Sequence, residues 1–404
     1  MGLHLCQLCE IAYFVTDKIP LENVLLTDYV TTDSLLPNKE GRCVAQNLPP
    51  QKCALTHYKC GDVLVANIRP YLKKIWFADR EGGASADVLV FRAKSGHSQE
   101  FLYASLLQDT FYDYVMKGKK GSKMPRGDRD QIMRYSIPKL SLAEEACIGN
   151  MILSFCTKIN INRQINDNLE AMAKQLYDYW FVQFDFPNEE GKPYKSSGGT
   201  MVWNEKLKRE IPQGWSNGVL SDVANITMGQ SPDGSSYNED GEGIIFYQGS
   251  TDFGLRFPDI RQYTTSPSRY ANKGDILMSV RAPVGALNIA NNDCCIGRGL
   301  SALSSKIGSI THLYYLMNDF RLKFEGMNSA GTTFGSITKD ELFSLPVIIP
   351  TKSVISEFEQ VCEPIFDKQM IIGEEINGLT KQRDELLPLL MNGQATVNYH
   401  LSTY

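Results

Sequence analysis

The sequence predicts an α+β fold made of two copies of one domain, each followed by a long helix. Three observations support this fold class. Short motifs recur at a nearly constant shift, each copy contains short apolar runs bounded by Gly, Pro or Asn, and each copy ends in a long amphipathic pattern. The 404 residues suffice for two or three domains, and 43% hydrophobic and 22% charged residues are typical of a folded globular protein.

The two halves of the chain repeat the same motifs. One group of motifs recurs at a shift of 212 or 213 residues, and another recurs without gaps at a shift of 210. The matched pairs are Leu8–Ala12 with Leu220–Ala224, Gly61–Leu64 with Gly274–Leu277, and Gly121–Leu176 with Gly331–Leu386. We therefore expect both halves to contain the same elements in the same order.

Each half is predicted to be an α+β domain with short strands. Runs rich in Val, Ile and Leu lie between Gly, Pro and Asn residues, which is typical of strands. The expected strands are Val63–Ile68, Val88–Phe91, Ile276–Val280 and Ile296–Leu303, followed by the closing strands Tyr135–Pro138 and Leu345–Pro350.

A long helix is predicted to follow each domain. In residues 142–181 apolar positions recur at steps of three, four and six, and about 40 residues would make a helix of roughly 60 Å. The second copy, 354–391, contains Pro364 and Pro388, so we expect a kink or shortening there. We expect the two helices to pack antiparallel as a coiled-coil-like spacer. The predicted helix seam consists of Leu169, Met172, Leu176, Leu379 and Leu386.

Domain boundaries follow from these elements. Residues 185–214 contain Gly-Lys-Pro and Ser-Ser-Gly-Gly, which is typical of a linker. The predicted segments are 1–140 for the first domain, 141–185 for the central helix, 186–210 for the linker, 211–350 for the second domain, 351–395 for the C-terminal helix and 396–404 for a tail.

Charge is distributed unevenly along the chain. The net charge is −5, but each of the segments 144–190 and 357–385 carries eight acids and three bases, so the remainder sums to +5. Within that remainder, Lys117–Arg134 holds seven bases against two acids. This segment is a candidate phosphate-facing patch, and a solvated charged loop is the alternative.

No motif of an enzyme active site stands out. The sequence has no Gly-rich dinucleotide loop after a strand, no P-loop and no G-x-S-x-G elbow. Asn47–Gln51 lacks the aromatic residue of an amino-methyltransferase motif, and Cys6 with Cys9 lacks a second close pair of zinc ligands. A non-catalytic protein without a metal site is favoured, and an enzyme with a duplicated fold is the alternative.

Neither a membrane span nor a targeting signal is predicted. The apolar stretches are much shorter than the roughly 20 residues that a membrane helix needs. The first 14 residues contain Glu10 and no Lys or Arg, unlike a secretory signal. A cytoplasmic location with reduced cysteines is therefore expected.

Several motifs together resemble a known family. They are Ile211–Trp215 leading into Leu220–Ala224, Lys273–Leu277 with Val280–Gly285, Gly331–Thr333 before Leu345–Pro350, and the helical segment Asn162–Phe181 continuing to Phe186. In this order and spacing they resemble the specificity (S) subunit of type I restriction-modification systems. The first half departs more from the pattern, with Asn67–Pro70 in place of the commoner short form.

The resemblance implies a non-catalytic DNA-binding subunit. Its two target recognition domains would each read one half of a split, asymmetric DNA target, and its helices would set the gap and bind methyltransferase (modification) subunits, two per chain. A restriction subunit could join the complex. The resemblance also implies that this chain binds no cofactor, because S-adenosylmethionine, ATP and Mg would be used by the partner subunits. The recognition subunit of a related multi-subunit nuclease-methylase system is the alternative within this class.

Candidate DNA contacts lie in loops of both domains. Basic side chains can hold phosphates or guanine edges, hydroxyl groups can bond phosphates, and Gln can read adenine. The segments Tyr29–Thr32 and Tyr247–Ser250 are secondary candidates beside strands. The predicted contacts are Arg69, Lys73, Lys74, Lys119, Lys120, Ser122, Lys123 and Arg126 in the first half, and Gln248, Ser250, Arg281, Thr332, Thr333 and Ser336 in the second.

Overall fold

The computed structural model describes residues 4–51, 53–119, 121, 123–329 and 335–397. The chain divides into two compact units, Met1–Arg163 with Ile376–Tyr404, and Gln164–Glu375. We call them the first and the second unit. Each unit combines one α+β domain with parts of both long helices, so the boundaries of the units fall inside the helices, and the first unit consists of two segments that are separate in the sequence.

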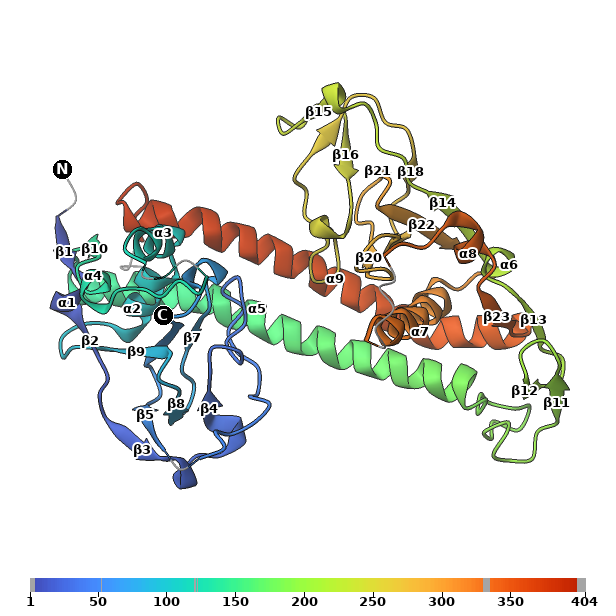
Figure 1. Ribbon diagram of the computed structural model, residues 1–404, viewed down its shortest axis with the longest axis horizontal. Helices are drawn as coiled ribbons and strands as arrows, with labels where there is room; N and C mark the ends of the chain where they lie inside the picture. Colours follow the sequence, from blue (N-terminus) through green and yellow to red (C-terminus); the bar gives the residue numbers. More distant parts are fainter. Residues whose placement is uncertain (1–3, 52, 120, 122, 330–334, 398–404) are drawn as a thin grey trace, which may run out of the picture. The chain divides into compact units, whose positions relative to one another are not determined.

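Two four-stranded sheets form the first domain (Figure 1). One has the order β2-β9-β6-β7, and the other has the order β3-β5-β8-β4, in which β4 runs parallel to β8. A short pair, β1 with β10, joins the ends of the domain. The strands are β1 (Leu5–Gln7), β2 (Ala12–Phe14), β3 (Lys18–Pro20), β4 (Tyr29–Val30), β5 (Ala54–Tyr58), β6 (Val63–Ala66), β7 (Ile75–Phe77), β8 (Gly82–Ala84), β9 (Val88–Ala93) and β10 (Ser136–Pro138).

The second domain repeats this arrangement. Its sheets have the orders β14-β22-β19-β20 and β15-β17-β16-β21-β18, and β16 runs parallel to β21 as β4 does to β8. β13 pairs with β23 as β1 does with β10. The strands are β13 (Ser216–Val219), β14 (Ala224–Met228), β15 (Tyr237–Asn238), β16 (Ile244–Tyr247), β17 (Tyr263–Thr264), β18 (Tyr270–Ala271), β19 (Ile276–Ser279), β20 (Leu287–Ile289), β21 (Cys294–Ile296), β22 (Leu300–Ser305) and β23 (Pro346–Ile349).

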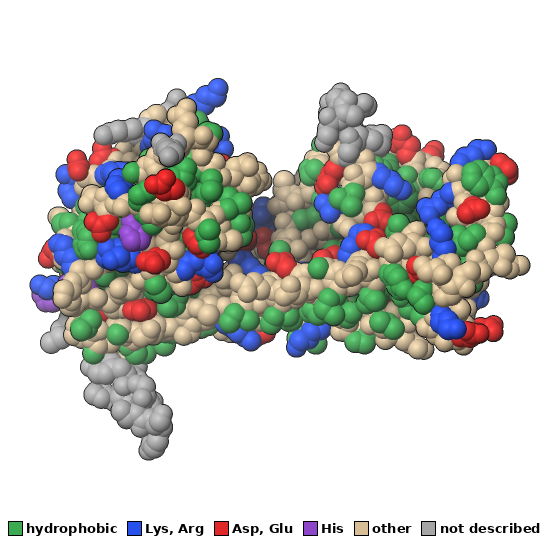
Figure 2. Space-filling model, turned by 90° about the horizontal axis from the view of Figure 1, so that it is seen from below, with side chains coloured by type: hydrophobic (Ala, Val, Ile, Leu, Met, Phe, Trp, Pro, Cys, Tyr) green, Lys and Arg blue, Asp and Glu red, His purple; other side chains and the backbone are tan. Residues whose placement is uncertain are grey.

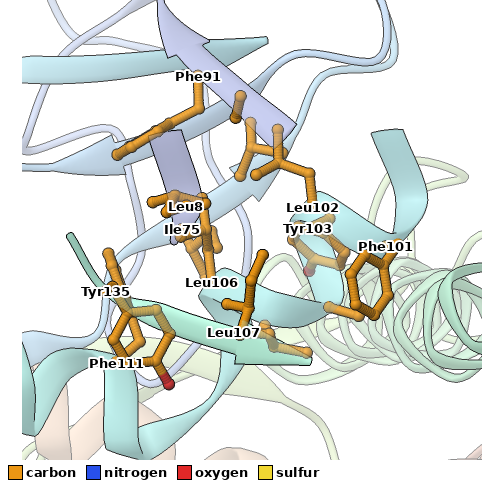
Figure 3. Close-up of a cluster of buried hydrophobic side chains, with 14 of the residues drawn as sticks. Leu8, Ile75, Phe91, Phe101, Leu102, Tyr103, Leu106, Leu107, Phe111 and Tyr135 are labelled. Carbon is orange, nitrogen blue, oxygen red and sulfur yellow. The ribbon is translucent and has the colours of Figure 1, made fainter. Parts of the chain in front are cut away.

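Alternation along the central strands places the sheets β2-β9-β6-β7 and β14-β22-β19-β20 each between two apolar layers. In β6, Val63 and Val65 join the core beneath the helices, whereas Leu64 and Ala66 face the core shared with the second sheet. Figure 3 shows the first of these cores, where side chains from β7, β9 and α2 meet. The second domain has the same two layers, with Ile276 on one face of β19 and Leu277 on the other. This period of two is what half-buried strands require.

Helices cover one face of the sheet β2-β9-β6-β7 in the first domain and of the sheet β14-β22-β19-β20 in the second. The first domain has α1 (Leu8–Ile11), α2 (Gln99–Leu107), α3 (Asp109–Lys117) and α4 (Arg129–Ile132). The second domain has α6 (Leu220–Val223), α7 (Ile310–Ser329) and α8 (Lys339–Phe343), so the single helix α7 takes the place of α2 and α3. Extended backbone at Gln108 (ψ 141°) ends α2 and starts α3.

Two long helices complete the fold. Helix α5 (Leu142–Tyr177) has 36 residues and continues into a π-helical turn, η4 (Asp178–Val182), and α9 (Lys352–Met391) has 40 residues. The expected shortening at Pro364 and Pro388 does not occur, because α9 includes both prolines. In the second unit the end of α5, with Ala173 and Tyr177, packs with Phe358 near the start of α9, which makes the pair antiparallel as predicted.

The predicted helix seam is only partly correct. Met172 is 52% exposed, and Leu169, Leu176, Leu379 and Leu386 are only half-buried. Positions that alternate at steps of three and four are buried instead, which is the spacing of a coiled coil. They include Glu145, Ile148, Ile152, Ile159, Asn162, Asn166 and Ala173 in α5, and Ile355, Phe358, Cys362, Gln369, Ile372, Ile376, Arg383 and Leu390 in α9. Because the polar residues Asn162 and Asn166 occupy two buried positions, a stripe traced through apolar residues moves onto the outer face.

The predicted linker is folded rather than extended. Within it, β11 (Met201–Asn204) pairs with β12 (Arg209–Pro212) as an antiparallel hairpin. Phe186 stacks between Tyr194 and Trp215, with ring centroids 4.7 and 5.1 Å away. These rings belong to the same hydrophobic cluster as Tyr177 of α5 and Phe358 of α9, so the segment packs on the long helices of the second unit. None of the helices in the described ranges is both long and apolar enough to cross a membrane.

Candidate DNA interface

Three segments converge at equivalent places in the two domains. We call them the arm (67–70 and 280–283), which follows β6 or β19, the turn (85–87 and 297–299), which follows β8 or β21, and the helix-entry loop (125–128 and 335–338), which precedes α4 or α8. Each pair of segments is related by a shift between 210 and 213 residues. The duplicated sequence motifs therefore build one duplicated surface.

Backbone hydrogen bonds hold the three segments together in the first domain. The amide of Asn67 donates to the carbonyl of Asp87 at 2.8 Å, which ties the arm to the turn. The amide of Arg69 donates to the carbonyl of Pro125 at 2.8 Å, and that of Gly127 donates to the carbonyl of Asn67 at 3.3 Å. These two bonds tie the arm to the helix-entry loop.

The second domain repeats the three hydrogen bonds at equivalent residues. The amide of Val280 donates to the carbonyl of Gly299 at 2.9 Å, that of Ala282 to Gly335 at 3.1 Å, and that of Ile337 to Val280 at 3.0 Å. Because the scaffold is the same, differences between the two surfaces come from the side chains that it presents.

Helix caps fix the far end of each helix-entry loop. The carboxylate of Asp128 accepts from the amides of Asp130 and Gln131 at the start of α4. At the equivalent position Thr338 caps α8, and its amide and hydroxyl donate to Glu341 at 2.8 and 2.7 Å. These hydrogen bonds hold the pKa of Glu341 below its ordinary value. The loops are thus anchored at both ends.

Exposed cations surround the first arm. Arg69 is exposed and has a left-handed backbone (φ 52°), and Lys119 and Lys123 are exposed on the loop that follows α3. The Arg126 guanidinium lies 3.1 Å from the Asp87 carboxylate, so this ion pair links the helix-entry loop to the turn. Four of the predicted contacts are therefore exposed on the arm, on the helix-entry loop and on the chain that leads to it.

Two other predicted lysines have partners inside the domain. The ammonium group of Lys73 lies 2.9 Å from the Asp109 carboxylate, and that of Lys74 donates to the carbonyl of Thr32 at 2.6 Å. Both side chains are half-buried. These contacts indicate that Lys73 and Lys74 stabilise the loops behind the surface.

The second domain presents a different set of side chains. Arg281 and Ser336 are exposed and lie opposite each other in a β-bridge between the arm and the helix-entry loop. Gln248 is exposed directly after β16, and its backbone N–H donates to the Asp252 carboxylate at 2.8 Å. Ser250 begins a 3-10 turn, η6 (Ser250–Asp252), and is half-buried.

Arg298 belongs to this surface but was not among the contacts predicted from the sequence. It is exposed in the turn between Gly297 and Gly299. A Cβ atom on Gly299 would lie 2.7 Å from the carbonyl oxygen of Gln248, so only glycine allows the two segments to approach this closely. The sequence feature that could have indicated Arg298 as a candidate contact is an arginine between two glycines after an apolar run.

Other predicted contacts cannot be placed on these surfaces. Lys120, Ser122, Thr332 and Thr333 lie outside the described residues. The rings of Tyr29 and Tyr247 are buried in the core, so only the residues after them can face a ligand. Within the described ranges, no three His, Cys, Asp or Glu side chains converge as a metal-binding group.

Both signs of charge occur on the molecular surface. Figure 2 shows Lys and Arg side chains intermixed with Asp and Glu on the face that it displays. The exposed cations described above are therefore a local feature of the arm and its neighbours. Such an arrangement can hold phosphates while other polar side chains contact base edges.

Residues 212–370 match the protein family described as "Type I restriction modification DNA specificity domain". The class defined by this match and by the duplicated surface is a DNA specificity protein with two equivalent domains. The chain is 30% identical over 305 residues to the putative type I restriction enzyme MjaX specificity subunit of Methanocaldococcus jannaschii, covering 74% of this chain and 67% of that protein. The chain belongs to the family of type I restriction enzyme specificity subunits.

Two further similarities span nearly the whole chain. The HindI specificity subunit of Haemophilus influenzae is 23% identical over 440 residues, covering 91% of this chain and 94% of that protein. The crystal structure of the type I restriction-modification system S subunit from M. genitalium has a TM-score of 0.62 at 14% identity, covering 97% of this chain and 96% of that chain. The latter supports the fold alone. As a member of this family, the chain is a non-catalytic recognition subunit, and the family works with methyltransferase and restriction subunits and DNA.

Proposed function

We propose that the two domains read the two halves of one split, asymmetric DNA target. The observation that carries this proposal is that one backbone scaffold presents different side chains at equivalent positions. Arg69 corresponds to Ala282, Asp87 to Gly299 and Arg126 to Ser336, whereas Ala86 corresponds to Arg298. Different hydrogen-bonding groups on equivalent surfaces favour different bases, which makes the target asymmetric.

The exposed cations are proposed to divide between phosphates and bases. Lys119 and Lys123 lie on a loop outside the converging segments, which suits contacts with the phosphate backbone. Arg126, Arg281 and Arg298 lie within the converging segments, where an arginine can reach guanine in the major groove. Gln248 is the candidate for reading adenine.

The outer faces of the long helices are proposed to bind two modification subunits. Ile161 in α5 and Ile371 in α9 are equivalent positions and are 47% and 59% exposed. In the second unit Met172 and Leu176 line a surface groove of 840 Å³ together with Tyr179. Exposed apolar side chains on a repeated helix favour a repeated protein contact. Two equivalent faces support two partner copies per chain.

Chemistry and location are proposed from the family relationship. Methyl transfer with S-adenosylmethionine, and any step that needs ATP and Mg, would belong to the partner subunits, while this chain binds no cofactor. The complex would act in the cytoplasm, where it meets chromosomal DNA. We further propose that helix length sets the gap between the half-sites, because α5 and α9 contain 36 and 40 residues and are about 54 and 60 Å long.

An electrophoretic mobility shift with purified modification subunits tests the proposal. We expect the complex of chain and modification subunits to bind and methylate DNA at a split motif, and the modification subunits alone to show no sequence preference. Arg126→Ala should alter preference in one half-site, and Arg281→Ala in the other. If both variants changed the same half-site, the assignment of one domain to each half-site would be wrong.

A further inference from the structure

The loop that follows the parallel strand contacts the long helices in both units. We call residues 31–42 and 248–259 the docking loops. Each loop folds back as a hairpin closed by a β-bridge, Leu35 with Arg42 in the first unit and Phe253 with Pro258 in the second, and the second hairpin is two residues shorter between its bridge residues. The two loops are therefore compared through the helix positions that they contact.

In the second unit Arg256 is buried between both helices. Its guanidinium donates to the carboxylate of Glu170 in α5 at 3.1 Å and to the side-chain carbonyl of Gln369 in α9 at 3.0 Å. The Gln369 amide also donates to Glu170, at 2.9 Å. The guanidinium stacks on Tyr314 and Phe366, 5.2 and 4.9 Å from the ring centroids. One side chain thus fixes the docking loop to two helices.

The next residue, Phe257, fills a notch beside a glycine of α9. Its side chain is buried with Ile289 and Phe366. A Cβ atom on Gly373 would lie only 2.7 Å from the Phe257 ring. This close approach requires glycine at position 373.

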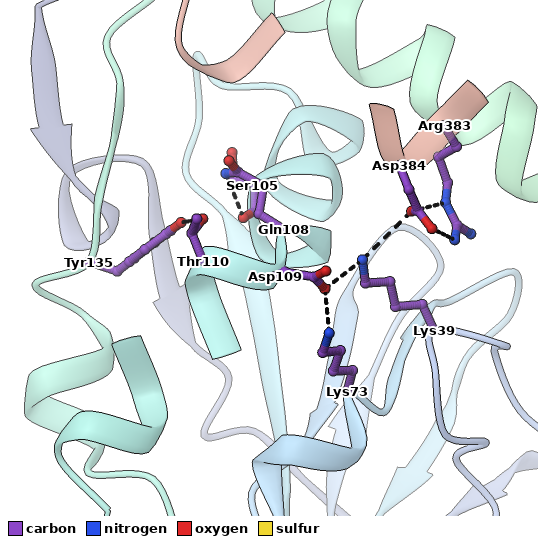
Figure 4. A network of polar contacts seen from close by, with 9 residues as sticks. All are labelled: Lys39, Lys73, Ser105, Gln108, Asp109, Thr110, Tyr135, Arg383 and Asp384. Atoms are coloured by element: carbon purple, nitrogen blue, oxygen red, sulfur yellow. Dashed lines mark hydrogen bonds and ion pairs between the residues drawn. The ribbon is translucent and has the colours of Figure 1, made fainter. Parts of the chain in front are cut away.

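In the first unit the contacts of the docking loop are ionic (Figure 4). The ammonium group of Lys39 is buried and lies 2.8 Å from Asp109 and 3.7 Å from Asp384 in α9. Burial alone would raise the pKa of Asp109, but the hydrogen bonds and charges of Lys39 and Lys73 hold it below its ordinary value. The carboxylate of Glu40 accepts from Arg163 in α5 at 3.0 Å.

The chemistry of the contact between docking loop and helix differs between the two units. The shift of 210 residues that relates the helices places Arg163 on Gly373, so Glu40 and Phe257 contact equivalent positions of the two long helices. One unit therefore has a carboxylate facing a guanidinium where the other has a phenyl ring facing a glycine. If a docking loop were placed on the helix of the other unit, Glu40 would face Gly373 without a charged partner, and Phe257 would collide with the Arg163 side chain.

The docking loops are also bonded to the chain that continues from the DNA arms. In the first unit, the amides of Asn38 and Lys39 donate to the carbonyls of Leu72 and Lys73, both at 2.9 Å. Asn38 and Lys39 have left-handed backbones, with φ of 54° and 64°, a conformation that side chains other than Gly rarely adopt. In the second unit the amide of Ile289 donates to the carbonyl of Arg256 at 3.0 Å.

We propose that each docking loop positions the DNA arm of its domain on the helices of its own unit. The different contacts Glu40–Arg163 and Phe257–Gly373 make each helix site accept only its own domain. The positioning residues act through the arm and do not touch DNA. This inference rests on the proposed assignment of one half-site to each domain.

A charge-swap cycle in the first unit tests the inference in the assembled complex with modification subunits. The variants are Glu40→Arg, Arg163→Glu and the double variant, with Glu40→Gln as the mild control. The measured quantities are the methylation ratio between cognate half-sites and half-sites with one changed base, and the thermal unfolding midpoint. We expect each single swap to lower selectivity about fivefold, at the half-site changed by Arg126→Ala only, and the double variant to recover it.

A second cycle covers the case in which a single swap prevents folding. Phe257→Glu and Gly373→Arg should each reduce selectivity at the other half-site, and the double variant, which recreates the Glu40–Arg163 pair, should restore it. The inference is overturned if either double variant is no better than its two single changes combined. It is also overturned if the single changes lower the unfolding midpoint but leave both selectivities unchanged. If the unaltered complex showed no sequence preference, the proposed function itself would fail.

Discussion

Substitutions on the outer face of α5 can separate an effect on partner binding from an effect on folding. Met172 and Ile165 are 52% and 40% exposed, although Met172 belongs to the helix seam predicted from the sequence. We expect the double change Met172→Ser and Ile165→Ser to leave the chain folded and to weaken its binding to the modification subunit. Ile152→Ala, at a fully buried seam position, is the matched control.

The magnitudes follow from burial. Complete burial of a Met or Ile side chain is worth about 1.5 to 3 kcal/mol, so covering the exposed half of each would contribute about 1 kcal/mol. Together the two changes should weaken partner binding by about 2 kcal/mol, roughly 30-fold in Kd. Exposed substitutions usually change the free energy of unfolding by less than about 0.5 kcal/mol, whereas Ile152→Ala should cost about 2 to 5 kcal/mol.

Calorimetry of partner binding and urea unfolding of the free chain measure the two quantities separately. The expected result is a weakened partner complex with an unchanged unfolding midpoint for the outer-face variant, and a lowered midpoint for Ile152→Ala. If the outer-face variant were destabilised as much as Ile152→Ala, the seam would pass through Met172. If both its stability and its partner affinity were unchanged, the partner would bind elsewhere.

Three other predictions concern charge, base reading and pH. Changing Lys119 and Lys123 to Gln should reduce the slope of log affinity against log salt by about 1.8, measured by fluorescence anisotropy with the modification subunits present, and an unchanged slope would exclude phosphate contacts there. Arg298→Ala should relax one base position of a single half-site at a cost of about 1 to 3 kcal/mol, and methylation sequencing that shows an unaltered motif would exclude base reading by this residue. Burial lowers the pKa of His312 from 6.5 to about 3 in the folded chain. Between these two values the unfolded chain binds a proton that the folded chain does not bind. The free energy of unfolding should therefore fall by about 1.4 kcal/mol for each pH unit below about pH 6.5. His312→Phe should remove that pH dependence in urea unfolding, and an unchanged dependence would assign it to other groups.

The duplicated architecture was predictable because repetition is a property of the sequence itself. Gly61 and Gly274 open equivalent strands, and the ungapped shift of 210 residues relates α5 to α9 as well as α4 to α8. The closing strands β10 and β23 were also predicted, because each is a short apolar run beside proline. Alternation of buried and exposed residues then determines which face of each strand meets the helices.

The helix seam was mispredicted because hydrophobicity and burial diverge in the middle of α5. Asn162 and Asn166 are 2% and 6% exposed, whereas Ile165 between them is 40% exposed. A pattern of apolar residues cannot reveal that an amide is buried against a partner helix. Two polar residues therefore moved the predicted stripe by one position.

Side-chain partners explain why only part of the candidate interface was predictable. The sequence marks Lys73 and Lys123 alike as bases near a loop, but the Lys73 ammonium pairs with Asp109 across the fold while Lys123 is exposed. Arg298 was missed because its significance depends on the close approach of Gly299 to Gln248. Such contacts join residues far apart in the chain, so they require the fold.

The central claim is that this chain reads two half-sites at a distance set by its helices. A four-residue insertion in α5 alone, near residues 171–175, would disturb the alternating seam, so the sharper test adds seven residues to each helix, after Arg163 and after Glu375. Seven residues preserve the heptad spacing and lengthen each helix by about 10.5 Å, which corresponds to about three base pairs. Methylated sites should be mapped by sequencing for the parent and the paired insertion variant. We expect the same two half-sites with a gap about three base pairs longer, whereas an unaltered gap or altered half-sites would show that the helices do not set the distance.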